Sequence, residues 1–488
     1  MITSELKQRD ITQNFINGAW VTPSTEETAP VFDSNTGSVI GSSPLSAEAD
    51  VDAAVSAAKL AQKEWRTLSP SARADYLRAI ARELEARHEE LSQLIMREVG
   101  ANQEISRGSQ TLTPIASFNI AADILESYNF VENIGDNLVM REPIGVVGAI
   151  TAWNFPLHLV TVKAAFAIAA GNTIVIKPSE VAPLTAAVLA EAVQSAKLPN
   201  GVINIVFGSG PDVGEAIVTH PDVAMLTFTG STKAGMRIGA LAAQKVAKVA
   251  LELGGKSPLV ILPDAPLQEA VEFGVGDLLL NNGQRCDGLT RMIVPKSLLP
   301  EVERIARETM DAVLVGPSTE STSEVGPLVS KTQQDRVLGY IDKGISEGAK
   351  LVTGGTDPIE TAEQNSQGYF VRPTVFSEVT NDMAIGREEI FGPVLSIQSY
   401  SNVDQAVEIA NGTEYGLHAA VFGSDIDAAL SIAARLEAGM VTVNGGESDI
   451  RAPFGGYKHS GIGREFGRYG FEEFLEIKAV RVPKNFRN

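Results

Sequence analysis

Between residues 144 and 253, short apolar runs alternate with helical stretches, and this alternation limits the fold more than any other feature of the sequence. Each run is apolar at consecutive positions, which is typical of a strand that is buried on both faces. Strands of this kind form a parallel sheet that helices cover on both sides. The expected strands are 144–152, 173–177, 202–206, 225–229 and 248–253, and the expected helices are 157–170, 184–196, 213–218 and 233–243.

The flanking regions predict further elements. Apolar residues recur at helical spacing in 51–61, after Ser46 as the expected N-cap, and in 77–91, after Pro70. Each stretch has one charged face, so both helices are expected to pack on a larger body. After Cys286 the alternation of strands and helices returns, which predicts a second α/β domain. Its expected strands are 292–294, 371–376, 394–400, 419–422 and 440–443.

Composition excludes several classes of function. A chain of 488 residues is too long for one hydrophobic core, so two or three domains are expected. The net charge of −20 would repel a polyphosphate, and no basic run offsets it, so we expect no nucleic-acid partner. The histidines form no ligand-spaced pair and there is one cysteine, so neither a metal nor an internal disulfide is expected. The N-terminus lacks a signal-peptide core and no apolar stretch reaches the ~20 residues that span a bilayer, which predicts a cytoplasmic protein without a membrane partner.

The single cysteine, Cys286, follows the polar stretch Asn281-Asn282-Gly283-Gln284-Arg285. A lone cysteine is most often a small buried hydrophobic residue. A polar approach with a flexible glycine, however, suits a nucleophile that is displayed in a cleft, and the adjacent Arg285 would favour the reactive thiolate. We therefore take Cys286 as the candidate nucleophile.

Two further candidates stand at the carboxyl ends of the expected parallel strands, where such sheets bind ligands. Glu252 ends an apolar strand, where it either pairs with a lysine such as Lys256 or acts as a general base whose pKa burial raises. Asn154 follows another strand, and its amide either donates to a developing oxyanion or caps a turn. The pattern alone leaves these alternatives open.

Two strand-to-helix junctions offer free backbone amides that could bind phosphate. Gly230-Ser231 follows the strand that ends at Thr229, and Gly208-Ser209-Gly210 forms a similar turn, although either also fits an ordinary capped helix. Glu180, which follows Lys177, is placed either to accept hydrogen bonds from ribose hydroxyls or to interact with a helix dipole. Neither junction is a GxGxxG motif, so the pattern is weak evidence for a dinucleotide.

Taken together, these stretches resemble the aldehyde dehydrogenase superfamily, in its non-phosphorylating, hydrolytic, NAD(P)-dependent branch. Each motif alone is modest, but their order and spacing over nearly the whole chain are highly specific. The matching motifs are Phe15-Ile16-Asn17-Gly18, Trp153-Asn154-Phe155-Pro156, Lys177-Pro178-Ser179-Glu180, Phe228-Thr229-Gly230-Ser231-Thr232, Glu252-Leu253-Gly254-Gly255-Lys256, Gly283-Gln284-Arg285-Cys286, Glu389-Ile390-Phe391-Gly392-Pro393 and Pro453-Phe454-Gly455-Gly456-Tyr457-Lys458.

The resemblance implies a catalytic role for five residues. Cys286 would attack the aldehyde carbon, and the Asn154 side chain together with the Cys286 amide would hold the oxyanion. After hydride transfer to the nicotinamide, Glu252 would activate the water that hydrolyses the thioester. Lys163 and Glu465 would belong to a proton path toward Glu252.

The resemblance also implies an NAD site, with NADP as an alternative. Lys177 and Glu180 would hold the adenosine ribose, Ser231 would contact the pyrophosphate, and Glu389 would hold the nicotinamide ribose. Because a carboxylate at Glu180 would repel a 2′-phosphate, NAD⁺ is favoured, although Lys177 lies nearby. The other implied cofactor residues are Thr151, Trp153, Ser179, Gly210, Gly214, Thr229, Gly230, Leu253 and Phe391.

The implied fold is α/β, with a Rossmann-like parallel-sheet cofactor domain, a second α/β catalytic domain and a small β oligomerisation flap. The implied boundaries are 1–124 with 144–253 for the cofactor domain, 254–460 for the catalytic domain, and 125–143 with 461–488 for the flap and C-terminal tail. Family members are usually homodimers or homotetramers, and the flap would pair a strand at 471–482 across subunits.

Two other functions are weighed against hydrolysis. A CoA-acylating relative resolves the same thioester by thiol exchange and needs no base for water, so Glu252 favours the hydrolytic branch. A catalytically silent binding protein on this scaffold would be expected to lack Cys286 or Glu252, and both are present. The aldehyde is indicated only weakly: Arg285 and Asp287 either face the substrate or pair with each other, and Val162, where relatives often carry a large aromatic, indicates a roomy tunnel.

Overall fold

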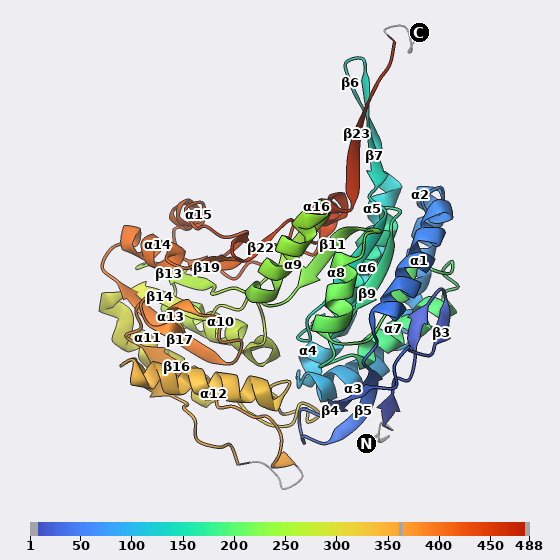
Figure 1. The fold of residues 1–488 in the computed structure, drawn as a ribbon. Helices are drawn as coiled ribbons and strands as arrows, with labels where there is room; N and C mark the ends of the chain where they lie inside the picture. Colours follow the sequence, from blue (N-terminus) through green and yellow to red (C-terminus); the bar gives the residue numbers. More distant parts are fainter. Residues whose placement is uncertain (1–7, 361–364, 484–488) are drawn as a thin grey trace.

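The computed structural model describes residues 8–360 and 365–483. These residues build two large sheets, each with helices against its faces, and a small third sheet that extends away from the body (Figure 1). The prediction of an α/β fold is therefore confirmed.

The first large sheet has five parallel strands at its centre and antiparallel strands at both edges. In spatial order its strands are β22 (Gly461–Ile462), β12 (Lys248–Glu252), β11 (Val223–Thr229), β8 (Val146–Ile150), β9 (Thr173–Lys177), β10 (Ile203–Ile205), β2 (Asn14–Ile16) and β3 (Ala19–Val21). The five strands expected from apolar runs are confirmed. They are buried on both faces, and the bounds differ by a few residues at most.

Helices cover both faces of this sheet, which is why its central strands tolerate apolar residues at consecutive positions. One face packs against α2 (Pro70–Glu85), α3 (His88–Glu98), α5 (Ser109–Ser127), α6 (Pro156–Ala169) and α7 (Leu184–Ser195). The other packs against α1 (Glu48–Trp65), α8 (Glu215–Thr219) and α9 (Thr232–Gln244). The short helix α4 (Gln103–Arg107) and the π-helical turn at Gly210–Gly214 join these elements.

Two expectations about the early helices are wrong. Ser46 is not the cap of α1, because its hydroxyl is bonded to the Asn14 side chain and the cap position is Ala47. The stretch 77–91 is not one helix, because the chain turns at Ala86–Arg87 between α2 and α3. Apolar spacing continues across that turn since both helices pack on the same core, so periodicity alone did not reveal the break.

The second large sheet confirms the second α/β region. In spatial order its strands are β15 (Lys350–Thr353), β16 (Thr374–Ser377), β17 (Val394–Tyr400), β14 (Arg291–Pro295), β13 (Pro258–Ile261), β19 (His418–Phe422) and β20 (Met440–Val443). Its helices are α10 (Leu267–Leu279), α11 (Leu299–Asp311), α12 (Lys331–Ser346), α13 (Ala384–Arg387), α14 (Val403–Asn411) and α15 (Ile426–Ala433). Only β15 is antiparallel to its neighbour. The expected strand 371–376 begins later, at Thr374, and β13 was not predicted.

The remaining strands form small sheets. The extending sheet consists of β6 (Val131–Ile134), β7 (Asn137–Pro143) and β23 (Leu475–Arg481), with β23 antiparallel along all of β7 (Figure 1). The expected strand 471–482 is shorter than predicted, because Phe471 lies in α16 (Gly467–Glu473). The others are β1 (Arg9–Asp10), β4 (Thr28–Phe32) and β5 (Val39–Pro44), and the pair β18 (Tyr415–Gly416) and β21 (Tyr457–Lys458). The domain boundaries drawn from the sequence stay predictions.

Candidate active site

Three predicted catalytic side chains come together where the two large sheets meet. Asn154 lies just beyond β8, Glu252 is the last residue of β12, and Cys286 follows the turn that ends α10. The Asn154 amide donates a 3.0 Å hydrogen bond to the carbonyl of Gln284, two residues before Cys286. Gly255 lies so close to the Cys286 carbonyl that an added Cβ would stand 2.3 Å from it. The segment after β12 and the Cys286 loop are therefore in direct contact.

The loop that carries Cys286 has an unusual backbone. Asn281, Asn282 and Gly283 have φ values of 53°, 61° and 74°, which are left-handed conformations at three consecutive positions. Asn is one of the few residues with a side chain that tolerates this region. The buried Asn282 side chain donates to the carbonyls of Gly100 and Pro327 at 2.8 and 2.9 Å and accepts from the Gly326 amide at 2.7 Å. These bonds fix the turn on both sides.

The following residue adds further anchors to the same loop. The Gln284 side chain donates to the Val99 carbonyl at 3.3 Å and accepts from the Val329 amide at 2.9 Å. Gln110 of α5 donates to the Asn154 carbonyl at 2.8 Å, and Asn281 donates to the same carbonyl at 3.0 Å. The Cys286 loop is thus tied both to the end of α3 and to the residues that precede α12.

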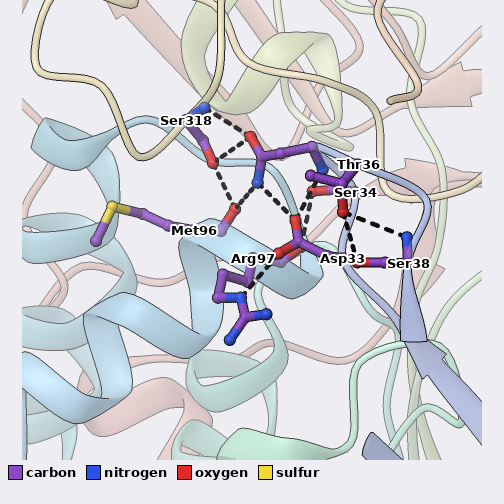
Figure 2. Close-up of polar contacts among 8 residues, drawn as sticks. Asp33, Ser34, Thr36, Ser38, Met96, Arg97 and Ser318 are labelled. Atoms are coloured by element: carbon purple, nitrogen blue, oxygen red, sulfur yellow. Dashed lines mark hydrogen bonds and ion pairs between the residues drawn. The ribbon is translucent and has the colours of Figure 1, made fainter. Parts of the chain in front are cut away.

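A second polar network lies beside these anchors (Figure 2). Asp33 accepts from Arg97 at 2.8 Å and from the side-chain amide of Asn35 at 2.9 Å, while Asn35 accepts from the Ser318 amide at 2.7 Å. Ser318 and Asn35 also donate to the Met96 carbonyl. The network clamps the loop after β4 to the end of α3 and to Ser318 of the second α/β region. The same end of α3 receives the Asn282 and Gln284 side chains.

Arg285 and Asp287 pair with each other, which is one of the two alternatives that the sequence left open. Arg285 bonds to Asp287 at 2.8 Å and to Asp277 at 3.1 Å. Burial raises the pKa of the Cys286 thiol well above its ordinary value, and the charges of Asp287, Glu389 and Glu252 raise it further. Arg285 acts in the opposite direction but does not outweigh them. The environment as a whole therefore favours the thiol, contrary to the expectation that Arg285 would favour the thiolate.

Glu252 does not pair with Lys256. Neither carboxylate oxygen has a hydrogen-bond partner among the described residues, and the side chain is buried. Burial raises the pKa of Glu252 well above its ordinary value, and the negative charge of Glu465 raises it further. The carboxylate lies against Gly455, where an added Cβ would stand 2.7 Å from its oxygen. A buried carboxyl group that keeps both oxygens free is suited to proton transfer.

Lys163 and Glu465 form a buried ion pair behind Glu252. The two residues are far apart in sequence, on α6 and just before α16, and the Lys163 ammonium also donates to Thr227 at 3.1 Å. The Lys163 charge opposes the rise in the pKa of Glu252. The two charges of the pair therefore shift the pKa of Glu252 in opposite directions, as expected of residues in a proton path to Glu252.

The predicted adenosine-ribose residues lie at the carboxyl end of β9. Lys177 donates to the Glu180 carboxylate and to the Gly208 carbonyl, both at 2.9 Å. Burial lowers the pKa of Lys177, whereas the Lys177 charge holds the pKa of Glu180 below its ordinary value despite burial. The Gly210 amide also bonds to Glu180. Glu180 is thus an ionised acceptor at the sheet edge.

The predicted nicotinamide-side residues gather beside β12. Glu389 accepts from the Gly255 amide at 3.0 Å, and burial raises its pKa to about 7. Gly254 leaves room for this carboxylate, because an added Cβ would stand 2.6 Å from its oxygens. Trp153 meets Phe391 edge to face, with ring centroids 5.3 Å apart.

The other predicted cofactor residues follow the carboxyl ends of β8, β9, β10, β11 and β12. The buried hydroxyls of Thr151 and Thr229 have no partner among the described residues. Ser231 caps α9 through the Ala234 amide at 3.3 Å, which is the ordinary capped helix that the sequence also allowed. The rest of the set, at the same edge, is Ser179, Gly210, Gly214, Gly230 and Leu253.

Comparisons with known proteins agree with this geometry. The family model described as "Aldehyde dehydrogenase family" matches residues 20–480. This chain belongs to the aldehyde dehydrogenase family. A curated relative from Pseudomonas sp., named 3-succinoylsemialdehyde-pyridine dehydrogenase, is 44% identical over 97% of this chain and 98% of its own length.

Two solved aldehyde dehydrogenases have nearly the same fold. AldC from Pseudomonas syringae, a mutant complexed with NAD⁺ and octanal, is 45% identical with a TM-score of 0.94 and covers 96% of each chain. The Mycobacterium tuberculosis enzyme, complexed with NAD⁺, is 39% identical with a TM-score of 0.95 and covers 99% of this chain and 100% of its own. The general reaction of an aldehyde dehydrogenase is the oxidation of an aldehyde to the carboxylic acid, and this chain is an oxidoreductase of that type.

In this aldehyde dehydrogenase, sequence reasoning missed the residues that hold the nucleophile loop. Asn281, Asn282 and Gln284 were noted only as polar neighbours of Cys286, and Gln110 was not noted at all. Two asparagines before a glycine are a signal for left-handed backbone, but these hydrogen-bond partners lie 44 to 182 residues away along the chain.

No three His, Cys, Asp or Glu side chains within residues 8–360 and 365–483 are grouped so as to hold a metal ion. None of the helices in the described part of the chain combines the length and the apolar character needed to cross a bilayer.

Proposed function

We propose that this aldehyde dehydrogenase oxidises aldehydes with NAD⁺ through a thioester on Cys286 that water hydrolyses. The observation that carries the proposal is a buried Glu252 carboxyl group with both oxygens free, in the same site as the single cysteine and the Asn154 amide. The overall change converts an aldehyde, water and NAD⁺ into a carboxylic acid, NADH and a proton.

The first step is attack of the Cys286 sulfur on the aldehyde carbon. Because burial keeps the thiol protonated, the attack requires a base, and Glu252 is placed to take the proton. The oxyanion of the thiohemiacetal accepts from the Cys286 backbone amide and from the Asn154 side chain. One N–H of Asn154 is used by the Gln284 carbonyl, and the amide has a second. Donors of this kind supply a few kcal/mol to the transition state.

The second half of the reaction releases the acid. Glu465 and Lys163 lie behind Glu252 and would carry away the proton that it took from the thiol in the first step. Glu252 then removes a proton from the water that attacks the thioester carbon, the carbon–sulfur bond breaks, and this proton passes to the Cys286 sulfur to restore the thiol. A carboxyl group whose pKa is raised by burial is a stronger base, once deprotonated, than an exposed one.

The residues at the sheet edge fit a dinucleotide. The unpartnered hydroxyls of Thr151 and Thr229 offer buried hydrogen bonds, and the ionised Glu180 offers acceptors for ribose hydroxyls. When bound there, NAD⁺ supplies the oxidant, since its nicotinamide accepts the hydride of the aldehyde carbon. Glu389 would hold the ribose next to that ring, with Phe391 and the other predicted cofactor residues around it.

Glu180 favours NAD⁺ over NADP⁺. Its carboxylate is held ionised by Lys177, so it would repel a 2′-phosphate while accepting hydrogen bonds from a 2′-hydroxyl. Lys177 is already engaged with Glu180 and two carbonyl oxygens, which leaves it a poor phosphate ligand. The NAD⁺ complexes of the two related structures agree with this choice.

The substrate class is an aldehyde with an apolar body. The relative from Pseudomonas sp. is named for a semialdehyde that carries a pyridine, and the AldC structure is complexed with octanal. Arg285 is paired with two carboxylates, so it does not offer a free charge to an acidic substrate.

The proposal also covers the location of the protein, its oligomeric state and its domain boundaries. We propose a cytoplasmic homodimer or homotetramer, in which β23 of the extending sheet pairs with a second copy. The strand has one unpaired edge, because among the described residues it pairs with β7 only, and Ile477 in its first half is 70% exposed. We also propose the predicted boundaries between the cofactor domain, catalytic domain and flap.

The test is NADH release by the purified protein, with and without CoA. We expect turnover of aliphatic and aromatic aldehydes with NAD⁺ alone, and Cys286→Ala should abolish turnover while NAD⁺ still binds. Turnover that strictly requires CoA would reject hydrolysis, and parent-level turnover by Cys286→Ala would reject the nucleophile.

A further inference from the structure

A row of rings begins next to the oxyanion amide. Phe155 follows Asn154 directly, and its ring lies 6.4 Å from that of His158, one turn further on at the start of α6. His158 in turn lies 5.4 Å from Phe466, and Phe466 lies 5.1 Å from Phe454. The catalytic machinery above does not use these four rings.

The rings of this row are accessible. Phe155, His158, Phe454 and Phe466 are all partly exposed, as is Cys286. Burial nevertheless lowers the pKa of His158 to about 4, and burial raises that of Cys286. The four rings can therefore be reached by a ligand, although His158 lies deep enough for burial to dominate its pKa. The Asp287 charge, one residue from Cys286, is felt at His158, so the two lie in the same part of the protein.

His158 is the polar member of this row. Its Nδ1 is buried and has no hydrogen-bond partner among the described residues. Because the ring is partly exposed, the accessible nitrogen is Nε2. A neutral imidazole carries one N–H and one acceptor nitrogen. An orphaned buried N–H is rarer in proteins than an orphaned acceptor, so the N–H is favoured on the accessible Nε2.

We propose that His158 is a specificity-determining residue that donates from Nε2 to an acceptor atom of the aldehyde substrate. The preferred substrates are aldehydes with an aryl body, which packs on Phe155, Phe454 and Phe466, and with an ether, keto or heteroaryl acceptor away from the reacting carbon. The inference rests on the proposed function and deepens it by naming a substrate class. It leaves the chemistry at Cys286 unchanged.

The experiment compares matched aldehydes that differ by one acceptor atom. The probes are 3-methoxybenzaldehyde against 3-ethylbenzaldehyde and 4-methoxybenzaldehyde against 4-ethylbenzaldehyde, in which an oxygen replaces a methylene group. The readout is the ratio of kcat/KM within each pair, for the wild type and for His158→Phe. Dividing one ratio by the other removes the electronic effect of the methoxy group and any general loss of activity.

We expect this double ratio to favour methoxy by about five-fold in at least one pair, which is the effect of one net hydrogen bond. His158→Gln, which keeps an N–H donor, should retain part of the preference. Equal ratios in wild type and His158→Phe for both pairs would overturn the proposal, as would equal loss in the Phe and Gln variants, which would assign the effect to ring shape.

Two outcomes separate this inference from the proposed function. If the wild type oxidises none of the four aldehydes and no aliphatic aldehyde, the proposed function itself fails. If it oxidises them and the double ratio is one, only the role of His158 fails. Should His158→Phe not fold, His158→Leu gives the same comparison, because it also removes both nitrogens.

Discussion

The loop that carries Cys286 and the strand end that carries Glu252 are built in opposite ways. Every polar side chain of Asn281, Asn282 and Gln284 is buried and bonded to backbone groups of distant segments. Glu252 is equally buried, yet neither of its oxygens has a partner in the described residues. The polar side chains of the Cys286 loop form hydrogen bonds that hold the loop in its shape. The carboxylate oxygens of Glu252 form none, which lowers the stability of the folded protein.

The difference fits the roles that we propose for the two regions. A nucleophile acts only if it is held within a few tenths of an ångström of its target, so anchoring bonds improve it. A general base acts only if its oxygens are free to take a proton, so satisfied hydrogen bonds would weaken it. The comparison therefore predicts that substitutions in the two regions change stability in opposite directions while both lower activity.

The largest effect is expected for Glu252→Gln. Without the base, deprotonation of the thiol and hydrolysis of the thioester should both slow, so we expect a slowed burst of at most about one NADH per site followed by turnover lowered about 100-fold or more. Rapid mixing with NADH fluorescence measures both phases. Glu252→Asp, which keeps a carboxyl group, is the matched control. Parent-level steady-state turnover by Glu252→Gln would remove Glu252 from the hydrolytic step.

The same variant should be more stable than the wild type. The folded-state pKa of Glu252 is raised above its unfolded value, so the folded protein loses stability as pH rises from about 4.5 through that folded pKa. Gln carries no charge and escapes this loss, so its Tm at pH 8 should rise by roughly 1–3 °C. At pH 4.5 the variant and the wild type should have the same Tm. A Tm of Glu252→Gln below that of the wild type at pH 8 would contradict the comparison between the two regions.

Asn282 tests the other side of the comparison. Asn282→Gly keeps the left-handed backbone but removes three buried hydrogen bonds, and Asn282→Ala adds a backbone penalty of about 1 kcal/mol. We expect kcat to fall about 10-fold in the glycine variant and further in alanine, with a lower Tm in both. The rate of Cys286 alkylation by iodoacetamide provides a readout of loop geometry.

Two results would separate shape from anchoring at this position. If Asn282→Gly keeps the kcat and alkylation rate of the wild type, the backbone conformation alone positions Cys286 and the side-chain bonds are dispensable. If kcat is retained while Tm falls, the hydrogen bonds of Asn282 serve stability only. The two regions would then differ in stability but not in how their polar groups serve catalysis.

The sequence predicted the sheet better than it predicted these two environments. The apolar runs at β8, β9 and β12 are visible because burial on both faces requires consecutive apolar residues, a local rule. The positions of Asn154 and Glu252 follow, since carboxyl ends of parallel strands share one edge. The candidate catalytic residues could thus be predicted from the sequence pattern and from the resemblance to the family.

What the sequence left out depends on distant partners. The anchoring of Asn282 on Gly100 and of Gln284 on Val99 each join segments that no local rule connects. The net effect on the Cys286 thiol was misjudged for the same reason. Arg285 was visible as a neighbour, whereas burial and the carboxylates that oppose it were not.

The smallest effect, a shift in pH dependence, probes how the free carboxyl of Glu252 is tuned. The charge of Glu465 raises the pKa of Glu252, and the charge of Lys163 opposes that rise. Since the base acts when deprotonated, Glu465→Gln should move the acid limb of the kcat–pH profile to lower pH, by about one unit. Lys163→Met should move it the other way, provided that thioester hydrolysis limits kcat, which the absence or presence of an NADH burst establishes. Opposite shifts would show that charges alone tune a base that no hydrogen bond restrains. Shifts in the same direction would mean that the ion pair holds Glu252 in place, and the two regions would then differ less than their hydrogen bonds indicate.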